Sequence, residues 1–406
     1  MGETRALECP SVPDKFGKSM NILKVVEACS AGVGRHVRSL CEDLVAPGHR
    51  LTVAYSPYRT DEAFERFVIG WRDRIRFVPI KVGRGVSPSS DSRAVVELLC
   101  LIRREGPFDV IHGHSSKGGA IARIAGRLCS IPTLYTPHSL ILHSPEITKQ
   151  EAAIYGSIER ALGHWATAKI IAVSEDEREF ILEHRLVPDD RIVVIPNGIE
   201  DQDLPGFPEK VAYEDIVQKP LTFGAAMRFS AQKAPEDVIE AFIRLNSKLP
   251  QLPMRLVIVG DGELFSDVRR QVEESGLSDK ISLLGWRSDV REVLHELDVF
   301  VVSSVYESGL SYAIMEAMAA KLPIVSTDVF GVRGTLSKVP GNILVPTGNP
   351  DAIAEGMKRI ATLAEPKSLR ESLQSIGQDN HEYVRTHFRQ SQVTRLVLQT
   401  YQEVCG

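Results

Sequence analysis

Two glutamates lie on either side of a short turn in the second half of the chain. Glu307 comes just before Ser308-Gly309, and Glu316 lies on the helix that the following residues predict. A carboxylate accepts hydrogen bonds from hydroxyl groups well, often two at a time. The pair therefore indicates a site for a polyhydroxylated ligand, although isolated acids are mostly exposed to solvent.

The elements around this turn favour a bound phosphate as well. An apolar run at residues 297–302 has the β-branched content of a buried parallel strand, and Ser311 can cap the helix that follows. In an open α/β sheet, ligands bind beyond the carboxyl ends of the strands, and a helix N-terminus there attracts phosphate. Phosphate and sugar can therefore lie side by side at this turn.

Two cations follow another strand end. Arg228 and Lys233 lie in the loop between a strand at residues 221–227 and a helix that begins near Pro235, since proline is favoured at the first helical position. Fixed cations aimed at a departing diphosphate stabilise the transition state of its departure. The alternative is that both side chains are simply solvated, as Arg and Lys in loops usually are.

The stretch from 307 to 319 resembles the paired-glutamate signature of retaining glycosyltransferase family 4, with Glu-Ser-Gly-Leu at 307–310 followed by Glu-Ala-Met-Ala at 316–319. The resemblance extends over nearly everything from residue 20 onward. It implies the GT-B architecture, in which two Rossmann-like, doubly wound α/β domains face each other across a cleft and a C-terminal helix crosses back to the first domain. It also implies a nucleotide-sugar donor.

The spacing of the two glutamates departs from the family pattern. Eight residues separate Glu307 from Glu316, one more than the family usually has. When the helix is aligned on Glu316, Ser308 occupies the place of the first glutamate and Glu307 is displaced by one. Either Glu307 reaches the sugar through a bulge in the turn, or Ser308 has taken its role.

The resemblance assigns catalytic roles to four residues. Arg228 and Lys233 correspond to the family's cation pair, and Glu307 to its first glutamate. His138 ends a Thr-Pro-His strand terminus that is similar to the family position contacting the donor sugar.

Further positions match the family's donor and acceptor sites. The donor-binding set is Gly32, Gly34, Asn197, Gly260, Trp286, Arg287, Ser308, Gly309, Leu310, Ser311 and Glu316, and the acceptor-side set is His114, Ser115 and Lys117. Alone, Gly32 and Gly34 indicate no more than a tight turn, because the third glycine of a dinucleotide fingerprint is missing. Trp286 is either a platform that stacks on the base or an ordinary core residue.

Histidines also cluster at strand ends in the first half. His112, His114 and His138 follow apolar runs, so they belong at the carboxyl edge of a sheet. Zinc needs three or four ligands in fixed geometry, and no Glu or Cys is spaced to complete a set. We therefore expect no metal and no cofactor, as the family resemblance also implies.

Strand and helix patterns alternate along the whole chain, which predicts parallel sheets. In the first half we expect strands at 21–26, 51–55, 75–79, 110–113, 133–136, 170–173 and 192–195, and helices at 92–104, 118–129, 149–166 and 175–184. The second half predicts strands at 221–227, 256–260, 281–284, 297–302, 322–326 and 343–345, then two helical segments.

These patterns suggest five parts. We expect a loose leader at 1–19, an acceptor domain at 20–200, a linker at 201–220, a donor-binding domain at 221–390 and a terminal helix at 391–406 that packs on the first domain. The boundary follows Asn197-Gly198, a dipeptide that favours turns.

Composition excludes several classes of protein. The 406 residues carry a net charge of −5, which gives no nucleic-acid footprint, and six scattered cysteines suit a reducing compartment. No apolar run approaches the roughly 20 residues that cross a bilayer. We expect a cytoplasmic or peripheral protein of two domains.

One stretch suits a membrane surface. Between residues 59 and 84, seven basic residues outnumber four acids, and Phe64, Phe67 and Trp71 are interleaved with them. That mixture predicts weak contact with anionic lipid, although a solvated helix face accounts for it equally well.

The resemblance implies a retaining hexosyltransferase that moves a sugar from a UDP- or GDP-sugar to a hydroxyl of a saccharide or lipid-linked saccharide, as in bacterial-type polysaccharide synthesis. No other acid is placed by the motif as a nucleophile, so a metal-independent front-face mechanism fits best. Two alternatives stay open. They are a nucleotide-sugar 2-epimerase of the same architecture and a non-catalytic module that binds nucleotide sugars.

Overall fold

A computed structural model describes residues 19–83, 87–144, 147–204, 219–363 and 366–406. The chain divides into two compact units, residues 1–134 with 405–406, and residues 135–404. The expected leader at 1–19 lies almost entirely outside the described residues, and so does most of the expected linker at 201–220.

The first half of the chain builds a sheet of seven strands. They are β1 (Asn21–Val26), β2 (Arg50–Tyr55), β3 (Arg76–Pro79), β4 (Val110–His114), β5 (Thr133–Thr136), β6 (Lys169–Ala172) and β7 (Ile192–Val194), and their order in the sheet is β3-β2-β1-β4-β5-β6-β7. β1 pairs in parallel with β2 and with β4. The reversal of strand order at β1 is the topological switch of a Rossmann-like fold.

Helices and short 3-10 turns connect these strands. They are α1 (Ala31–Val45), η1 (Pro57–Arg59), α2 (Glu62–Trp71), α3 (Pro88–Glu105), α4 (Ser116–Cys129), η2 (Ile141–His143), α5 (Lys149–Ala166), α6 (Glu175–Glu183), η3 (Asp189–Arg191) and η4 (Asp201–Asp203). α3 and α4 share one buried cluster with β1 and β4, built from Leu98, Ile111 and Ile121 among others. Such a crossover, strand to helix to parallel strand, is what the alternating pattern predicts.

The second half builds a sheet of six strands. They are β8 (Leu221–Ala226), β9 (Met254–Val259), β10 (Ile281–Leu283), β11 (Val299–Val302), β12 (Ile324–Thr327) and β13 (Ile343–Val345), in the order β10-β9-β8-β11-β12-β13. Each pair of neighbouring strands in this sheet is parallel. Two parallel α/β sheets confirm the predicted fold class.

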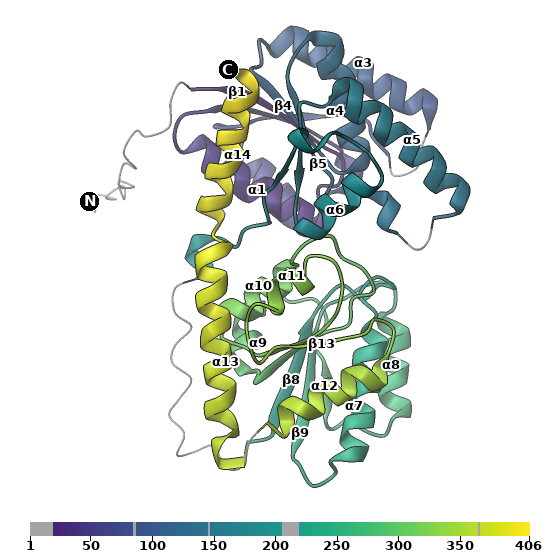
Figure 1. Cartoon of the computed structure of the whole chain (residues 1–406), viewed down its shortest axis with the longest axis vertical. Coiled ribbons are helices and arrows are strands. Elements are labelled where there is room, and N and C mark those ends of the chain that lie inside the picture. The colour runs from purple at the N-terminus through teal and green to yellow at the C-terminus, as the bar shows by residue number, and fades with distance from the viewer. Residues whose placement is uncertain (1–18, 84–86, 145–146, 205–218, 364–365) are drawn as a thin grey trace, which may run out of the picture. The chain divides into compact units, whose positions relative to one another are not determined.

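Both faces of the second sheet are covered by helices. One face packs against α7 (Pro235–Lys248), α8 (Phe265–Glu274) and α12 (Pro350–Ala361), and the other against α9 (Val290–Glu296), α10 (Tyr312–Ala319) and α11 (Arg333–Leu336) (Figure 1). Because both faces are buried, strands such as β11 are continuously apolar. The carboxyl ends of the strands are left for the loops that carry the polar motifs.

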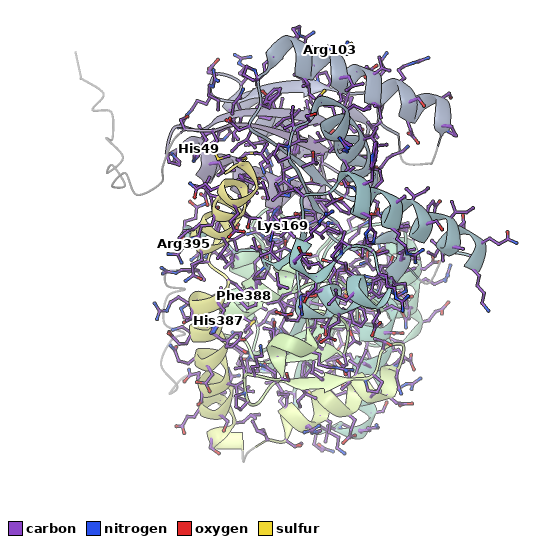
Figure 2. The ribbon with its side chains drawn as sticks, turned by 45° about the horizontal axis from the view of Figure 1, so that its top comes forward. His49, Arg103, Lys169, His387, Phe388 and Arg395 are labelled. Carbon is purple, nitrogen blue, oxygen red and sulfur yellow. The ribbon has the colours of Figure 1, made fainter. Side chains whose placement is uncertain are left out.

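The C-terminus differs from the prediction. Three helices follow β13, namely α12, α13 (Pro366–His387) and α14 (Gln390–Cys405), where the sequence predicts two helical segments. α13 and α14 are separated at Phe388, beside His387 (Figure 2). The Ile199 N–H donates to the Phe388 carbonyl at 2.8 Å, and the Gln390 N–H donates to the Ile199 carbonyl at 2.8 Å. The helix ends because these backbone groups pair with Ile199 instead of continuing the helical ladder.

The last residue of α14, Cys405, belongs to the first unit. The Cys405 thiol lies 3.3 Å from the Asp109 carbonyl, at the residue before β4. Along α14, Val393, Val397 and Tyr401 are buried. Among the described helices, none combines the length and the apolar character that crossing a bilayer requires.

Candidate functional site

The Glu307 turn begins where β11 ends and finishes at the N-terminus of α10. Ser311 is the N-cap, and its side chain accepts the Ile314 N–H at 3.4 Å. Leu310 is buried, so the turn is anchored in the core directly before the helix. Glu316, on α10, is partly buried. The strand, turn and helix thus have the order that the sequence predicts.

Lys233 and Glu307 form an ion pair beyond the carboxyl ends of neighbouring strands. The Lys233 Nζ pairs with Glu307 Oε1, and the two side chains are 22% and 11% exposed. Lys233 follows β8 and Glu307 follows β11, two strands that pair in parallel at Val299 and Phe223. The sheet therefore brings together two site residues that the sequence analysis named separately.

Backbone and side-chain hydrogen bonds fix the two loops to each other. Ser303 Oγ donates to the Lys233 carbonyl at 2.7 Å. The Val305 N–H donates to the Gln232 carbonyl at 2.8 Å, and Gln232 Nε2 donates to the Tyr306 carbonyl at 3.1 Å. Because both partners of the ion pair sit on this joined structure, their relative position is preorganised.

Arg228 has a different partner from Lys233. Its guanidinium lies 3.2 Å from Glu263, and the two side chains are 65% and 55% exposed. Glu263 follows Gly260-Asp261-Gly262 in the adjoining loop. A Cβ on Gly260 would lie 1.7 Å from the Met227 carbonyl oxygen, and one on Gly262 would lie 2.3 Å from that of Phe229. Glycine is required there because the loop packs directly against the backbone beside Arg228.

Trp286 is 65% exposed, so its interpretation as an ordinary core residue is wrong. It lies in the loop after β10, next to Gly285, which has a φ of +68°. Arg287 pairs with Asp289, its Nε 2.7 Å from Oδ1. An exposed indole beyond a strand end is available to stack on a base.

Ser308 has a different environment from Glu307. It is buried, and its Oγ is hydrogen-bonded to His143 Nδ1 at 3.0 Å. Its carbonyl accepts a hydrogen bond from Ser174 Oγ. Gly309 lies close to Val173, where an added Cβ would come within 2.9 Å of Val173 Cγ2.

His138 lies in a strained loop after β5. Its φ is +54°, and that of Ser139 is +95°. Left-handed backbone at non-glycine residues is unusual and often occurs at functional sites. The Ser139 N–H donates to the buried carboxylate of Glu177 at 3.3 Å. The sequence analysis missed Glu177, which is recognisable only once α6 is seen to bury it.

Asn197 and Gly198 lie where the chain leaves β7. The Asn197 Oδ1 is buried without a hydrogen-bond partner in the described part of the chain. A Cβ on Gly198 would lie 2.7 Å from the Gln390 Cα, which explains the glycine. Asn197 therefore keeps an acceptor oxygen available.

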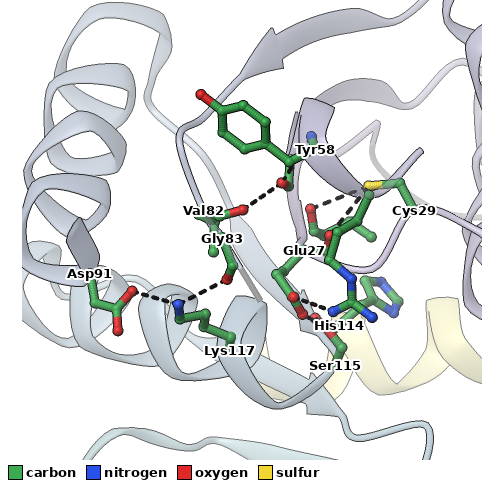
Figure 3. A network of polar contacts seen from close by, with 12 residues as sticks. Glu27, Cys29, Tyr58, Val82, Gly83, Asp91, His114, Ser115 and Lys117 are labelled. Atoms are coloured by element: carbon green, nitrogen blue, oxygen red, sulfur yellow. Dashed lines mark hydrogen bonds and ion pairs between the residues drawn. The ribbon is translucent and has the colours of Figure 1, made fainter. Parts of the chain in front are cut away.

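The three acceptor-side residues belong to a polar network at the carboxyl edge of the first sheet (Figure 3). His114 is buried at the end of β4. Ser115, with a φ of +61°, donates its hydroxyl hydrogen to Glu27 at 3.1 Å. Lys117 lies 2.8 Å from Asp91 and donates to the Gly83 carbonyl at 2.9 Å.

Glu27, which accepts from Ser115 and pairs with Arg59, was missed from the sequence. It is buried directly after β1, and Arg59 pairs with its other oxygen. The signal was present, because a carboxylate immediately after an apolar strand belongs at the ligand-binding edge by the rule that identified His114.

The turn before α1 is occupied by an acid. The Ala31 N–H donates to Asp61 Oδ2 at 2.8 Å, and Ala31 has a φ of +50°. A Cβ on Gly34 would lie 2.6 Å from the Cys29 carbonyl oxygen, so close packing explains this glycine. A carboxylate at this helix N-terminus disfavours a phosphate at the same N–H group. The role expected of Gly32 and Gly34 stays a prediction.

Comparison with known proteins identifies the family. Residues 31–198 match the family described as Glycosyl transferase 4-like domain, and residues 219–362 match Glycosyl transferases group 1. Over 298 residues the chain is 30% identical to the UDP-Gal:alpha-D-GlcNAc-diphosphoundecaprenol alpha-1,3-galactosyltransferase of Escherichia coli, covering 71% of this chain and 74% of that protein. The chain belongs to glycosyltransferase family 4.

Other relatives agree with this assignment. The phosphatidyl-myo-inositol mannosyltransferase of Mycobacterium leprae is 25% identical over 80% of this glycosyltransferase and 82% of its own length. The crystal structure of Anabaena Alr3699/HepE in complex with UDP and glucose superposes with a TM-score of 0.76 at 17% identity, covering 95% of this chain and 100% of that one. The likeness to that structure confirms the GT-B fold.

Proposed function

We propose that this glycosyltransferase moves a hexose, with retention at the anomeric carbon, from a UDP-sugar to a hydroxyl of a saccharide carried on a lipid diphosphate. The relative from Escherichia coli uses UDP-galactose and a diphosphoundecaprenol-linked sugar, according to its name. HepE was crystallised with UDP-glucose. These likenesses favour UDP over GDP and a lipid-linked acceptor.

The Lys233–Glu307 pair is the observation that carries the proposal. An ammonium and a carboxylate held together at the strand edge complement the two halves of a nucleotide sugar. Lys233 suits the diphosphate oxygens, and Glu307 suits hydroxyl groups of the hexose. When no donor is bound, each neutralises the other.

The proposed reaction uses the leaving group as the base. The bond between the anomeric carbon and the β-phosphate oxygen breaks, and the acceptor oxygen bonds to the same face of that carbon. The acceptor proton passes to an oxygen of the departing diphosphate. Arg228 and Lys233 stabilise the negative charge that develops there, so the protein supplies position and charge. The family resemblance implies that no metal is needed.

A donor panel tests the proposal. The protein is incubated with UDP- and GDP-sugars in the presence of EDTA, and slow donor hydrolysis is followed. We expect turnover of one UDP-sugar, and proton NMR of the first product should show the anomeric configuration of the donor. Inverted product contradicts retention. A C2-epimerised nucleotide sugar formed without acceptor would identify an epimerase, and binding without any turnover would identify a non-catalytic module.

Membrane contact at residues 59–84 stays a proposal, and fewer of the apolar side chains in this stretch are exposed than the sequence predicts. Phe64 and Phe67 are buried in the first unit, where Phe67 packs against Phe77. The expectation that these two aromatic residues face lipid is therefore wrong. Ile69 is exposed and Trp71 is partly so.

A sedimentation assay tests this surface. We expect weak, salt-sensitive binding to phosphatidylglycerol vesicles that decreases when Ile69 is replaced by Asp. Equal recovery in the supernatant with and without these vesicles at low salt excludes the contact. The proposed location, at the cytoplasmic side of a membrane, depends on this result.

A further inference from the structure

We infer that His143 is a positioning residue that holds the Glu307 turn through Ser308. The inference rests on the proposed function and explains the extra residue between the two glutamates. Both segments lie in the compact unit of residues 135–404. Their separation of 165 residues along the chain is why no local pattern reveals the contact.

The donor and the acceptor of the hydrogen bond between His143 and Ser308 follow from the surroundings of the ring. His143 Nδ1 lies 3.0 Å from Ser308 Oγ, while its Nε2 is buried without a partner among the residues that the structure describes. A buried N–H without a partner is rarer and more costly than a buried lone pair. The proton therefore belongs on Nδ1, which donates to Ser308 Oγ. Burial, with a smaller effect of His184, lowers the pKa of His143 to about 4, so the ring is neutral near pH 7.

The imidazole is itself fixed by two aromatic rings. Its centroid lies 3.9 Å from that of Phe180, edge to face, and 5.2 Å from that of Phe330. A ring packed this way has little freedom to rotate, so its Nδ1–H has a fixed direction.

One further contact ties the same turn to the N-terminus of α6, and another ties the neighbouring loop at Gly331 to it. Ser174 Oγ donates to the Ser308 carbonyl while it also caps α6 by accepting the Glu177 N–H at 3.0 Å. Asp176 accepts the Gly331 N–H at 2.6 Å. A Cβ on Gly331 would lie 2.3 Å from the Gly309 Cα, so these loops are stacked backbone to backbone.

The consequence concerns Glu307, which directly precedes Ser308. With Ser308 turned toward His143, the preceding residue is left to pair with Lys233. His143 thereby selects which of the two residues faces the donor. It does so without touching the reacting atoms, and a loss of this positioning should slow the chemical step more than it weakens nucleotide binding.

The test uses His143→Ala, His143→Asn and His143→Gln in the full-length protein. The side-chain nitrogen of Asn occupies nearly the place of Nδ1 and donates a hydrogen, whereas that of Gln corresponds to Nε2. We expect His143→Ala to lower kcat for transfer about tenfold while the Kd for UDP changes less than about threefold, as a lost hydrogen bond of ordinary strength would. His143→Asn should recover most of the rate and His143→Gln little of it. His184→Ala, which removes the neighbouring ring on Phe180, is the matched control and should keep the wild-type rate.

A double-mutant cycle with Ser308→Ala completes the test. If His143 acts through Ser308, the double variant should be no slower than His143→Ala alone. Additive effects overturn the inference, and so does an Asn variant as slow as the Ala variant. If the wild type turns over no UDP-sugar, the proposed function fails by itself. The inference is then decided by urea unfolding, where additive effects of His143→Ala and Ser308→Ala would contradict it.

Discussion

A glutamate pairs with a cation at the carboxyl edge of each sheet, but the two glutamates differ in how many partners they have. At the first edge, Glu27 is buried and has one oxygen on Arg59 and the other on Ser115. At the second edge, Lys233 is the one ion-pair partner of Glu307 among the residues that the structure describes, and Arg228 pairs with Glu263 at the surface. A fully satisfied network resists change, whereas a single ion pair can exchange its partner for a ligand. We infer that Glu27 stabilises the fold at the first edge, whereas the Lys233–Glu307 pair at the second edge is open to a ligand.

The largest expected effect is a loss of unfolding free energy when Glu27, at the first edge, is replaced. Glu27→Ala removes the acceptor of the partly buried Arg59 guanidinium and one acceptor of Ser115, which should cost about 2 to 4 kcal/mol in the free energy of unfolding. Urea unfolding measures this. The control is Glu62→Ala, whose pair with Arg66 is exposed and should be worth less than about 1 kcal/mol. If both variants lose the same stability, the network at Glu27 is not structural.

At the second edge, the expected loss is in rate. Lys233→Ala and Arg228→Ala should each slow single-turnover transfer by about a hundredfold or more, because each removes a contact to the charge of the leaving group. Unfolding free energy and UDP affinity should change little. Lys248→Ala, at the far end of the helix after Lys233, is the control. Rates within a few-fold of wild type would remove these two cations from the mechanism.

Glu177 is a second buried carboxylate, and it adds a pH dependence to the comparison of Glu27 with Glu307. It accepts hydrogen bonds from the backbone N–H groups of Val173 and Ser139. Burial raises its pKa from 4.5 to about 7, against the opposing effect of those N–H groups. A carboxyl whose pKa is higher in the folded state than in the unfolded state stabilises the fold at low pH. That contribution is lost as pH rises through about 7.

We therefore expect the free energy of unfolding to fall by up to about 3 kcal/mol between pH 5 and pH 8 because of Glu177. Glu177→Gln cannot titrate and should flatten this dependence, while Glu179→Gln, exposed on the same helix, should keep it. Parallel pH curves for wild type and Glu177→Gln would show that the buried group does not titrate in this range.

The smallest effect concerns Ala234, which follows Lys233 and is the N-cap of α7. Its φ is +43°, in the left-handed region. Ala234→Gly should relieve strain and raise the free energy of unfolding by about 1 kcal/mol or less without changing the rate. Ala241→Gly lies inside α7, the helix that begins directly after Ala234, and should instead destabilise the protein by about 1 kcal/mol or more. Destabilisation by Ala234→Gly would mean that the left-handed alanine is not strained.

Much of the fold could be predicted from local patterns. The strand Thr133–Thr136 and the helix Lys149–Ala166 have the predicted bounds, because period and flanking turns define them. The alternation of strands and helices was enough to predict two parallel sheets. Alternation by itself does not place the break at Phe388, close to the expected start of the terminal helix at 391, since the hydrogen bonds that cause it come from Ile199, far away in the sequence.

The site was predictable where it depends on strand ends and not where it depends on burial. Lys233 and Glu307 were named because each follows a strand, and the sheet order then places them together. The burial of Phe64 and Phe67, the exposure of Trp286 and the partner of Ser308 depend on tertiary packing. The domain ranges from 20 to 390 and the roles of the site residues stay predictions.

The central claim is that Glu307, and not Ser308, contacts the donor sugar, and one comparison of variants tests it directly. Single-turnover rates with the preferred UDP-sugar are measured for wild type, Glu307→Ala and Ser308→Ala. Losing a charged hydrogen bond to the transition state should cost Glu307→Ala about 2 to 4 kcal/mol, while Ser308→Ala should lose no more than about tenfold in rate. A slower Ser308→Ala than Glu307→Ala would contradict the account, because it would place the serine in the glutamate's role.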